Sequence, residues 1–484
     1  MVTAAPRTRD GRWPAPGRAA LPRGRATAEA TGQRGAWRRA GSLVLRAAPL
    51  ALAAALALAA AVLWSYAVAL AVDRLDGRSS EPREDIVAFY VGGKMLQEGR
   101  SERLYDVQAV AGEEAVVLGR SAGYHGGLPF LNPPFVAGLF YPLALLPYGV
   151  AQAVWLGLSV AALAAALALL WPELRCLERK WAVVFVLAAL ASAPVFWSLL
   201  YGQLSTLVLL SWVASYRLLK ARREGVAGLV LAVCLIKPPL AVVPALFLLT
   251  TGRWRAFAAF AAGGALLGAA SLALVGPQTA LVDYPRLMLE SVDWRSEYGI
   301  DRPHMFGWNG LLSLLLGGHA PELERALGVA ASLATLAAAV YVWRRLDSQG
   351  NEAGLTLAVA SAAVLFSPHI HLQDLQIMIL PAALLVGLRP DKSRFDVLLP
   401  AALFVLAPLA LTGANLVTPL LAGSLAYQLR QTLAKAPFGW RVAWATAQAA
   451  AGGRVRSAWR LAGRLVSAAD RIRALPPSPT TTVR

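Results

Sequence analysis

The chain has 484 residues, of which 57% are Ala, Val, Ile, Leu, Met, Phe, Trp, Tyr or Cys, while only 15% are charged. Soluble domains average about 45–50% apolar, with glycine counted, and about 25% charged. The composition therefore argues against an ordinary soluble enzyme, and a chain this apolar cannot stay disordered and solvated. Its two cysteines, Cys176 and Cys234, exclude a disulfide scaffold and a cysteine-based zinc site. What remains is a polytopic membrane protein.

The formal net charge of +18 is concentrated at the two ends of the chain. Residues 1–46 carry ten arginines and two acids, and residues 428–484 carry ten basic residues and one acid. Basic tails beside an apolar body follow the positive-inside rule and are attracted to anionic lipid headgroups. Aromatic residues do not alternate with the N-terminal arginines as a binder of single strands requires, so we expect no nucleic-acid partner.

In chain order, the first apolar span is 50–72, and the segment before it lacks the cleavage site of a signal peptide. A polar stretch, 73–131, follows as a first outer loop. The later apolar segments are 135–171, 181–200, 204–219, 226–236, 240–249, 257–275, 327–343, 355–366, 375–388, 397–411 and 417–429. A crossing needs about 20 mostly apolar residues, or fewer where short helices pair inside protein.

Basic clusters occur at every second junction between these segments, and the intervening junctions nearly lack them. The clusters contain Arg175, Arg179, Lys180, Arg217, Lys220, Arg222, Arg223, Arg253, Arg255, Arg344, Arg345, Arg389, Lys392 and Arg394. The alternation predicts about twelve crossings with both termini cytoplasmic and a second outer loop at 276–308. Segment 135–171 is long enough for two spans broken at Pro142 or Pro147, one of them short or re-entrant, so the count varies by one or two.

The predicted organisation is thus an all-α membrane domain over 47–430, between a basic tail at 1–46 and another at 431–484. Residues 454–473 place arginines among apolar residues, which predicts an amphipathic helix on anionic lipid. No nucleotide-binding loop is present and no cytoplasmic domain could house one. Chemistry is therefore expected at the outer face, where a group donor has to be carried by a lipid.

Asp85, directly after Glu84, precedes an apolar run with helical periodicity that predicts a helix lying flat on the membrane. The helix dipole favours an ionised Asp85 at its first turn. A carboxylate fixed at the interface is what a general base for an acceptor hydroxyl requires. The alternative is an N-cap acid with no other task.

Three further positions lie near the outer face. Tyr105 closes the same helical segment, and Asn132 precedes Pro133 and Pro134, which the pattern favours as a rigid entry turn into the bilayer. Gln203 either binds a sugar hydroxyl or caps the next helix.

Lys237 is the only charged residue of segment 229–249. An unpaired ammonium within a membrane costs several kcal/mol. We therefore expect it to bind a lipid phosphate in a polar cavity, or to pair with an internal acid.

His369 and His371 lie with Asp374 at another outer turn. The favoured interpretation is that both histidines form hydrogen bonds at the start of a helix, and metal binding is the least favoured. An acid–base role for one of them ranks between these two interpretations. Asn309 follows Trp308 at the end of the second outer loop and could border a sugar site. We predict no metal and no cofactor.

Taken together, these residues resemble the GT-C superfamily of membrane glycosyltransferases, and glycosyltransferase family 87 in particular. The similar elements span about residues 50–425. They are Asp85 with Tyr90, Gly99, Leu104, Tyr105, Asp106, Pro133, Pro134, Pro142, Leu146, Pro147, Trp155, Gly202, Gln203, Gly228, Lys237, Pro238, Gly252, Arg253, Trp254, Arg255, Asn309, Ser367 and Pro368 with the nearby histidines.

The resemblance implies a transferase of the bacterial plasma membrane that moves a hexose, mannose in the best-known members, from polyprenyl phosphate to a lipid or glycan acceptor with inversion. It implies that the base is Asp85, the stronger match, or its neighbour Glu84, that Lys237 stabilises the leaving phosphate and that His369 or His371 is functional. Tyr90, Tyr105, Asn132, Gln203 and Asn309 are then substrate-binding candidates. Many relatives have Tyr where this chain has Asn132, which leaves the donor and acceptor open.

Two rival functions remain. A transporter or lipid flippase should carry several mid-span ionisable residues and two related halves, but only Lys237 qualifies and no repeat is visible. A non-catalytic scaffold would lack an acid near residue 85 in the site.

Overall fold

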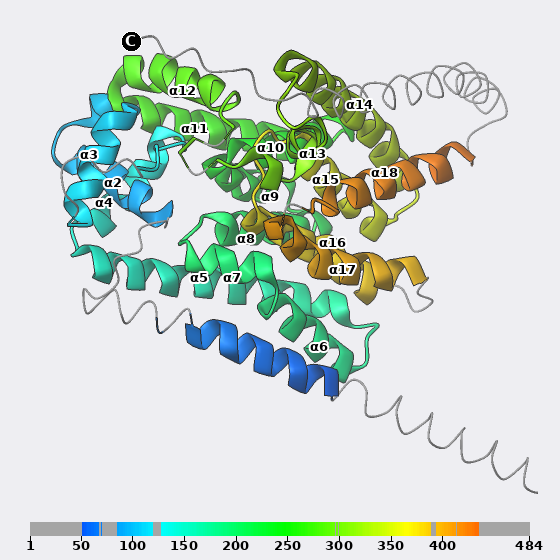
Figure 1. The fold of residues 1–484 in the computed structure, drawn as a ribbon. Helices are drawn as coiled ribbons and strands as arrows, with labels where there is room; N and C mark the ends of the chain where they lie inside the picture. The colour runs from blue at the N-terminus through cyan, green and yellow to red at the C-terminus, as the bar shows by residue number, and fades with distance from the viewer. Residues whose placement is uncertain are drawn as a thin grey trace, which may run out of the picture. The chain divides into compact units, whose positions relative to one another are not determined.

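The computed structural model describes residues 51–66, 69, 85–119, 127–295, 297–298, 300–388, 394–412 and 414–434 (Figure 1). The chain divides into two compact units, Met1–Ala55 and Leu56–Arg484. Of the first unit, only the start of helix Ala51–Tyr66 is described. The basic tail 1–46, the second tail beyond Ala434 with the helix predicted at 454–473, and Glu84 lie outside the described residues. The following paragraphs concern the second unit.

The described residues of this unit are helical, apart from turns and one isolated antiparallel bridge between Phe306 and Ile370, so the predicted all-α class is confirmed. The first helices are α2 Asp85–Gln97, α3 Val107–Val117, α4 Pro134–Ala144, α5 Tyr148–Leu170, α6 Arg179–Leu190, α7 Ala193–Leu200, α8 Ser205–Lys220, α9 Glu224–Ala232 and α10 Pro238–Thr250. They are followed by α11 Trp254–Gln278, α12 Tyr284–Ser291, α13 Gly307–Leu316, α14 Pro321–Ser348, α15 Glu352–Phe366, α16 Ile379–Gly387, α17 Arg394–Leu406 and α18 Val417–Ala434. Short 3-10 helices connect several of them, together with the π-helix η4 Thr279–Asp283. The 3-10 helices are η1 Ser101–Arg103, η2 Trp171–Leu174, η3 Val233–Ile236, η5 Arg302–His304, η6 Leu372–Met378 and η7 Ala407–Thr412.

Three helical stretches of the described chain are long and apolar enough to cross a membrane: Tyr148–Leu174, Trp254–Ser291 and Pro321–Ser348. The pair α6 and α7 would make a fourth, bent by 43°. Eight further apolar helices of the described chain have only 10–17 residues. The predicted number of about twelve crossings is therefore not confirmed, because most segments counted from the sequence form helices shorter than a bilayer requires.

Prolines cause much of this shortening. α4 ends at Ala144 and α5 begins after Pro147, so the apolar segment 135–171 is broken at Pro147 while Pro142 stays inside α4. With 11 residues, α4 is about 16 Å long, roughly half a bilayer. Gly276 adopts a left-handed φ of 79° before Pro277 and kinks the helical stretch that continues from α11.

α2 confirms the helix predicted after Asp85, but not as an element lying on a surface. Nine of its 13 residues are buried, and α4 packs along it. The approach is close at Gly93, where a Cβ atom would lie 2.7 Å from the backbone of Phe140. Among its residues only Asp85, Lys94 and Leu96 are half-buried and only Gln97 is exposed. Helices α3, α12 and α13 were not predicted from the sequence.

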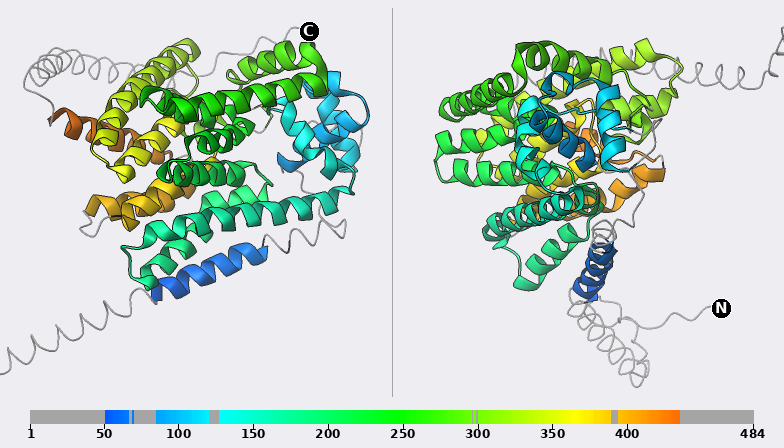
Figure 2. Two further views of the ribbon diagram at one scale, coloured as in Figure 1. Left: turned by 180° about the vertical axis from the view of Figure 1, so that it is seen from behind. Right: turned by 90° about the vertical axis from the view of Figure 1, so that its left-hand side faces the viewer.

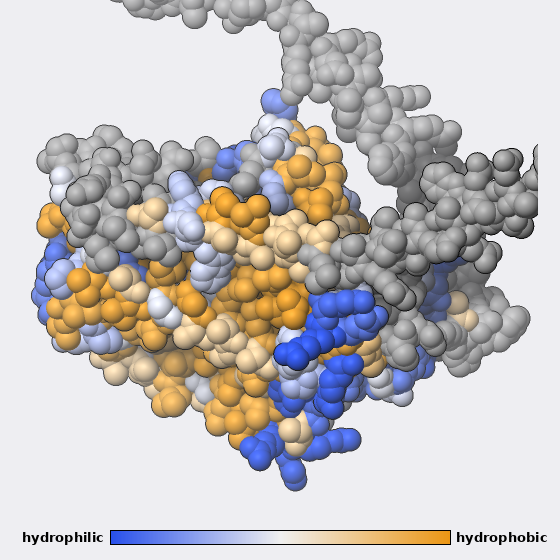
Figure 3. Space-filling model, turned by 90° about the horizontal axis from the view of Figure 1, so that it is seen from below, coloured by the Kyte–Doolittle hydropathy of each residue, from blue (hydrophilic) through white to orange (hydrophobic). Residues whose placement is uncertain are grey.

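The remaining helices pack as neighbouring pairs, with α9 along α11, α14 along α15 and α5 along α8 (Figures 1 and 2). On the face seen in Figure 3, much of the coloured surface is apolar, with polar side chains gathered in places. On α5, Val150, Val154 and Leu158 are exposed by 40–51% and recur every fourth residue. An exposed apolar stripe of this kind is suited to contact with lipid.

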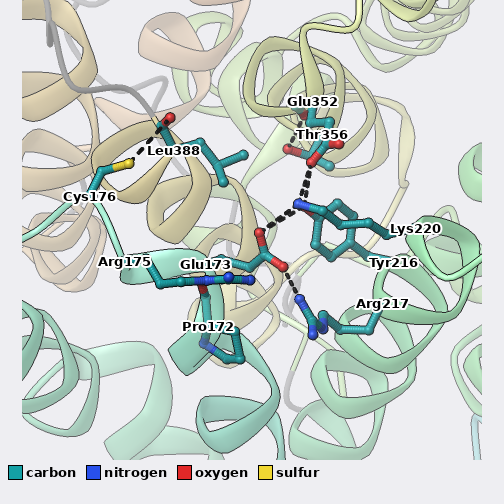
Figure 4. Close-up of polar contacts among 10 residues, drawn as sticks. All are labelled: Pro172, Glu173, Arg175, Cys176, Tyr216, Arg217, Lys220, Glu352, Thr356 and Leu388. Carbon is teal, nitrogen blue, oxygen red and sulfur yellow. Dashed lines mark hydrogen bonds and ion pairs between the residues drawn. The ribbon is translucent and has the colours of Figure 1, made fainter.

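A charged cluster joins one set of helix ends (Figure 4). Glu173 of η2 is 1% exposed and pairs with Arg217 and, at 2.8 Å, with Lys220, both at the end of α8. Lys220 and Tyr216 also bind Glu352, the first residue of α15, at 2.9 and 2.7 Å. Residues from three of the junctions that were predicted to share one side of the membrane therefore meet in one place.

Candidate active site

Asp85 begins α2 and is joined to the turn between α7 and α8. Its Oδ2 accepts a hydrogen bond from Gln203 Nε2, and the Ile86 N–H donates to the Tyr201 carbonyl at 3.2 Å. Gly202 has a φ of 65°, and a Cβ atom there would lie 2.7 Å from the Cβ of Ile86. Glycine is required here both by the left-handed turn and by the close approach of α2. The turn thus sets the position of Gln203 against Asp85.

Lys237 stands between η3 and α10 and forms a buried ion pair. Its Nζ lies 2.6 Å from Asp374 Oδ1 and donates to Ser205 Oγ at 3.0 Å, and Ser205 Oγ also donates to Asp374 Oδ1 at 2.8 Å. The Lys237 side chain is 16% exposed and that of Asp374 only 4%. Of the two readings of Lys237, pairing with an internal acid is the one observed. The lysine side chain as a whole is less completely buried than its partner.

The two histidines differ in their surroundings. The His371 N–H donates to Asp374 Oδ2 at 3.1 Å, and its imidazole interacts electrostatically with Asp85, Asp374 and Lys237. His369 interacts electrostatically with His371 and Arg302 instead. Both of its ring nitrogens are buried without a hydrogen-bond partner among the described residues. His371 therefore belongs to the cluster around Asp85, and His369 lies beside it.

Burial sets the direction of the pKa shift of Asp85 and of both histidines, whereas the charges of Lys237 and His371 lower the pKa of Asp374. Burial raises the pKa of the Asp85 carboxyl, while the hydrogen bond from Gln203 and the charges of His371 and Lys237 lower it. Burial also lowers the pKa of His371, and lowers that of His369 to about 4. Burial thus opposes the effect of the helix dipole on Asp85 that the sequence suggested. A carboxylate with a raised pKa is a stronger base, as proton abstraction from a hydroxyl requires.

The other candidate residues contact backbone rather than this cluster. The Tyr90 hydroxyl donates to the Leu146 carbonyl at 2.8 Å. The Tyr105 hydroxyl donates to the Asn132 carbonyl at 2.7 Å, and Asn132 Nδ2 donates to the Ile236 carbonyl at 2.8 Å. Ile236 is the residue before Lys237. Tyr105 and Asn132 therefore hold the backbone next to the lysine in place.

Asn309 lies on α13, where the amide oxygen would be 2.6 Å from a Cβ atom placed on Gly328 of α14. The structure therefore brings together Asp85, Gln203, Lys237 and His371, whereas the contacts of Tyr90 and Asn309 lie elsewhere. The described residues contain no group of three or more His, Cys, Asp or Glu side chains arranged to hold a metal ion.

Two members of the cluster were not predicted as site residues, namely Ser205 and Asp374. Asp374 is the only charged residue between Ser367 and Leu388, just as Lys237 is in its own apolar segment. Two lone and opposite charges in apolar segments predict a pair, since neither is stable alone in low dielectric. Ser205 gives no comparable indication in the sequence.

The fold and this cluster define a class, a helical membrane protein with a carboxylate, an ammonium and an imidazole gathered where several helices end. The model of glycosyltransferase family 87 matches residues 130–368. The resemblance to glycosyltransferase family 87 is thereby confirmed over these residues, which make up just under half of the chain. Gln203, Ser205 and Lys237 lie within the matched region, and Asp85 and His371 lie outside it.

Two curated relatives carry the same name, polyprenol-phosphate-mannose-dependent alpha-(1-2)-phosphatidylinositol pentamannoside mannosyltransferase. The protein from Mycolicibacterium smegmatis is 27% identical over 248 residues, which are 50% of this chain and 57% of the relative. The one from Mycobacterium tuberculosis is 29% identical over 256 residues, or 50% of this chain and 54% of the relative. The match thus spans little more than half the length of these relatives. No solved structure matches the chain.

Proposed function

We propose that the protein is an integral-membrane hexosyltransferase that moves mannose from a polyprenyl-phosphate donor to a lipid or glycan acceptor. The observation that carries the proposal is the cluster itself, in which a carboxylate of raised pKa lies within electrostatic reach of Lys237 and His371. The family match and the names of both curated relatives support the same chemistry. They favour a transferase over the rival transporter.

Asp85 acts as the general base. Its carboxylate takes the proton of an acceptor hydroxyl, and the hydroxyl oxygen attacks the anomeric carbon from the side opposite the phosphate. The bond between that carbon and the phosphate oxygen breaks, so the sugar is transferred with inversion. Gln203 holds the carboxylate through its Nε2 donor, which keeps the base oriented for the attack.

Lys237 stabilises the negative charge that develops on the departing polyprenyl phosphate. Asp374 and Ser205 hold the ammonium at the edge of the cluster through contacts of 2.6 and 3.0 Å. The pairing with Asp374 therefore positions Lys237 for an incoming anion. The His371 N–H donates to the same aspartate, Asp374. The His371 imidazole interacts electrostatically with Lys237, Asp374 and Asp85.

We place the reaction at the outer face of the plasma membrane. α8 begins at Ser205, in the cluster around Asp85, and ends at Lys220, in the cluster around Glu173. Its 16 residues separate these two clusters by about 24 Å. Arg217 and Lys220, from one of the predicted basic junctions, pair with Glu173 at that end, and the positive-inside rule assigns a basic end to the cytoplasm.

The test is a transfer assay with the full chain reconstituted in liposomes that contain native lipid extract. Polyprenyl-phosphate mannose and a nucleotide-linked mannose are supplied separately, each with a radiolabelled sugar. We expect covalent label in the acceptor only from the polyprenyl donor, and its loss in Asp85→Asn. Asp293→Asn is the matched control, because the Asp293 side chain is 59% exposed and pairs only with Arg325 among the described ion pairs.

Transfer from the nucleotide donor would contradict the proposed donor class. Movement of intact polyprenyl-phosphate mannose between leaflets without covalent transfer would favour the transporter instead.

A further inference from the structure

Arg302 of η5 is a largely buried guanidinium beside the start of α14. Its Nη2 donates to the Val292 carbonyl, and its Nη1 lies 4.0 Å from Glu324 Oε2. Glu324, 4% exposed, is already occupied, because Oε2 accepts from Arg295 at 2.8 Å and Oε1 from the Gly318 N–H at 3.1 Å. Glu324 thus attracts Arg302 by charge but accepts no hydrogen bond from it.

Most donors of Arg302 have no acceptor among the described residues. A guanidinium has five N–H donors in a planar fork. The structure gives that of Arg302 one hydrogen-bond acceptor, while only 12% of the side chain is exposed. A planar fork of open donors out of bulk water is suited to binding an oxyanion through two oxygens at once.

A second and independent observation comes from His369. The Phe306 N–H donates to the Ile370 carbonyl at 2.8 Å, and this bridge lays the turn that contains Arg302 against the turn that contains His369. Both ring nitrogens of His369 are buried and lack a partner in the described part of the chain. Arg302 and His371 act on this imidazole electrostatically.

The acidic residues around Arg302 have other partners. Asp293 pairs with Arg325 at 2.7 Å, and Asp301 with His304 at 2.8 Å. Glu297 accepts from the Arg295 N–H. Glu324, Asp293 and Glu297 act on Arg302 electrostatically, and Arg302 in turn acts on the His369 imidazole.

We propose that Arg302 and His369 form a phosphate-binding subsite next to the cluster around Asp85. The inference rests on the proposed function, for which it names a second recognition element. The ligand is a phosphate ester of a lipid, either the phosphate of the polyprenyl donor or the headgroup phosphate of a phospholipid acceptor. Arg302 grips two phosphate oxygens, neutral His369 donates one hydrogen bond, and Glu324 positions the guanidinium.

The test measures ligand binding by the purified full chain in detergent, without any transfer. The probes are polyprenyl phosphate, phosphatidylinositol, and the uncharged polyprenol and diacylglycerol. We expect Arg302→Gln to weaken binding of one phosphate lipid by about ten- to hundredfold. Binding of the uncharged lipids should be unchanged. Loss confined to polyprenyl phosphate identifies the donor phosphate, and loss confined to phosphatidylinositol identifies the acceptor headgroup.

The matched control is Arg286→Gln, because Arg286 is 77% exposed and pairs with Glu290 on its own helix. Arg302→Lys, which keeps the charge but not the fork, should bind with intermediate affinity and guards against misfolding in the glutamine variant. Wild-type affinity of both Arg302 variants for both phosphate lipids would overturn the subsite. An equal loss for uncharged polyprenol would also overturn it, by showing that Arg302 acts through packing.

This outcome is separate from that of the proposed function. Transfer by a wild-type protein whose Arg302 variants bind normally would remove the subsite alone. Selective weakening in Arg302→Gln without transfer from any donor would remove the proposed function alone.

Discussion

The pair formed by Lys237 and Asp374 offers the sharpest structural test, because it is buried and short. At 2.6 Å and an effective dielectric constant of about 20, the attraction is about 6 kcal/mol. Desolvation of both groups offsets much of this gain, and breaking such a pair by removing one partner costs about 3–5 kcal/mol. We therefore expect Asp374→Asn to destabilise the protein by about 3 kcal/mol, because an amide still accepts one hydrogen bond from Lys237.

Thermal unfolding in detergent, followed by tryptophan fluorescence, measures this loss. A destabilisation of that size should lower Tm by about 3 °C. The double variant Lys237→Met with Asp374→Leu should recover most of the loss, because apolar residues of similar volume replace a buried pair at little cost. Arg286→Gln breaks an exposed pair and should change stability by less than about 1 kcal/mol. The reasoning fails if Asp374→Asn melts like wild type, or if the losses of the two single substitutions simply add in the double variant.

Three further predictions concern the turn before α8, the base and the opposite end of the bundle. Gly202→Ala should reduce the transfer rate by about 10²-fold while folding is largely kept. The Cβ of the new alanine would displace Ile86 and shift Gln203 away from Asp85. A normal transfer rate would contradict this reasoning. Asp85 must be ionised to act and burial raises its pKa, so kcat/KM should rise with pH through a midpoint above the ordinary pKa of aspartate. Gln203→Leu should move this midpoint higher, because a hydrogen bond to the charged form of Asp85 is lost. A pH profile unchanged by this substitution would refute the assignment of Asp85 as the base. Glu173→Gln should lower the free energy of unfolding by about 2 kcal/mol, which is less than for a fully buried pair because Arg217 and Lys220 are about one-third exposed. The substitution should leave binding of polyprenyl phosphate unaltered. Weaker binding would show that the Glu173 cluster is coupled to the cluster around Asp85.

The sequence predicted the helical class and most element positions because apolar runs and charge alternation record which residues face lipid and water. Lengths were less predictable. The sequence could not show that α4 would stop at Ala144 before Pro147, nor that Pro142 would stay within a helix. Proline restricts the backbone locally, whereas packing decides on which side of it a helix ends.

Of the site, Asp85, Gln203, Lys237 and His371 were predicted and lie together. Asp374 was named only beside the histidines, and its role with Lys237 depends on a contact across 137 positions that no local pattern reveals. Arg302 was not singled out, because its meaning depends on Glu324 and His369 in separate elements. Long-range pairing of this kind follows from tertiary structure.

The central claim, that Asp85 is the base of a sugar transfer, is tested most directly by a single-turnover measurement. Reconstituted wild type and Asp85→Asn are each loaded with polyprenyl-phosphate mannose carrying a radiolabelled sugar, and the rate of label appearing in the acceptor is followed. We predict a rate lower by about 10²–10⁴-fold in the variant, with unchanged melting and unchanged affinity for polyprenyl phosphate. A variant rate within about threefold of wild type would contradict the account.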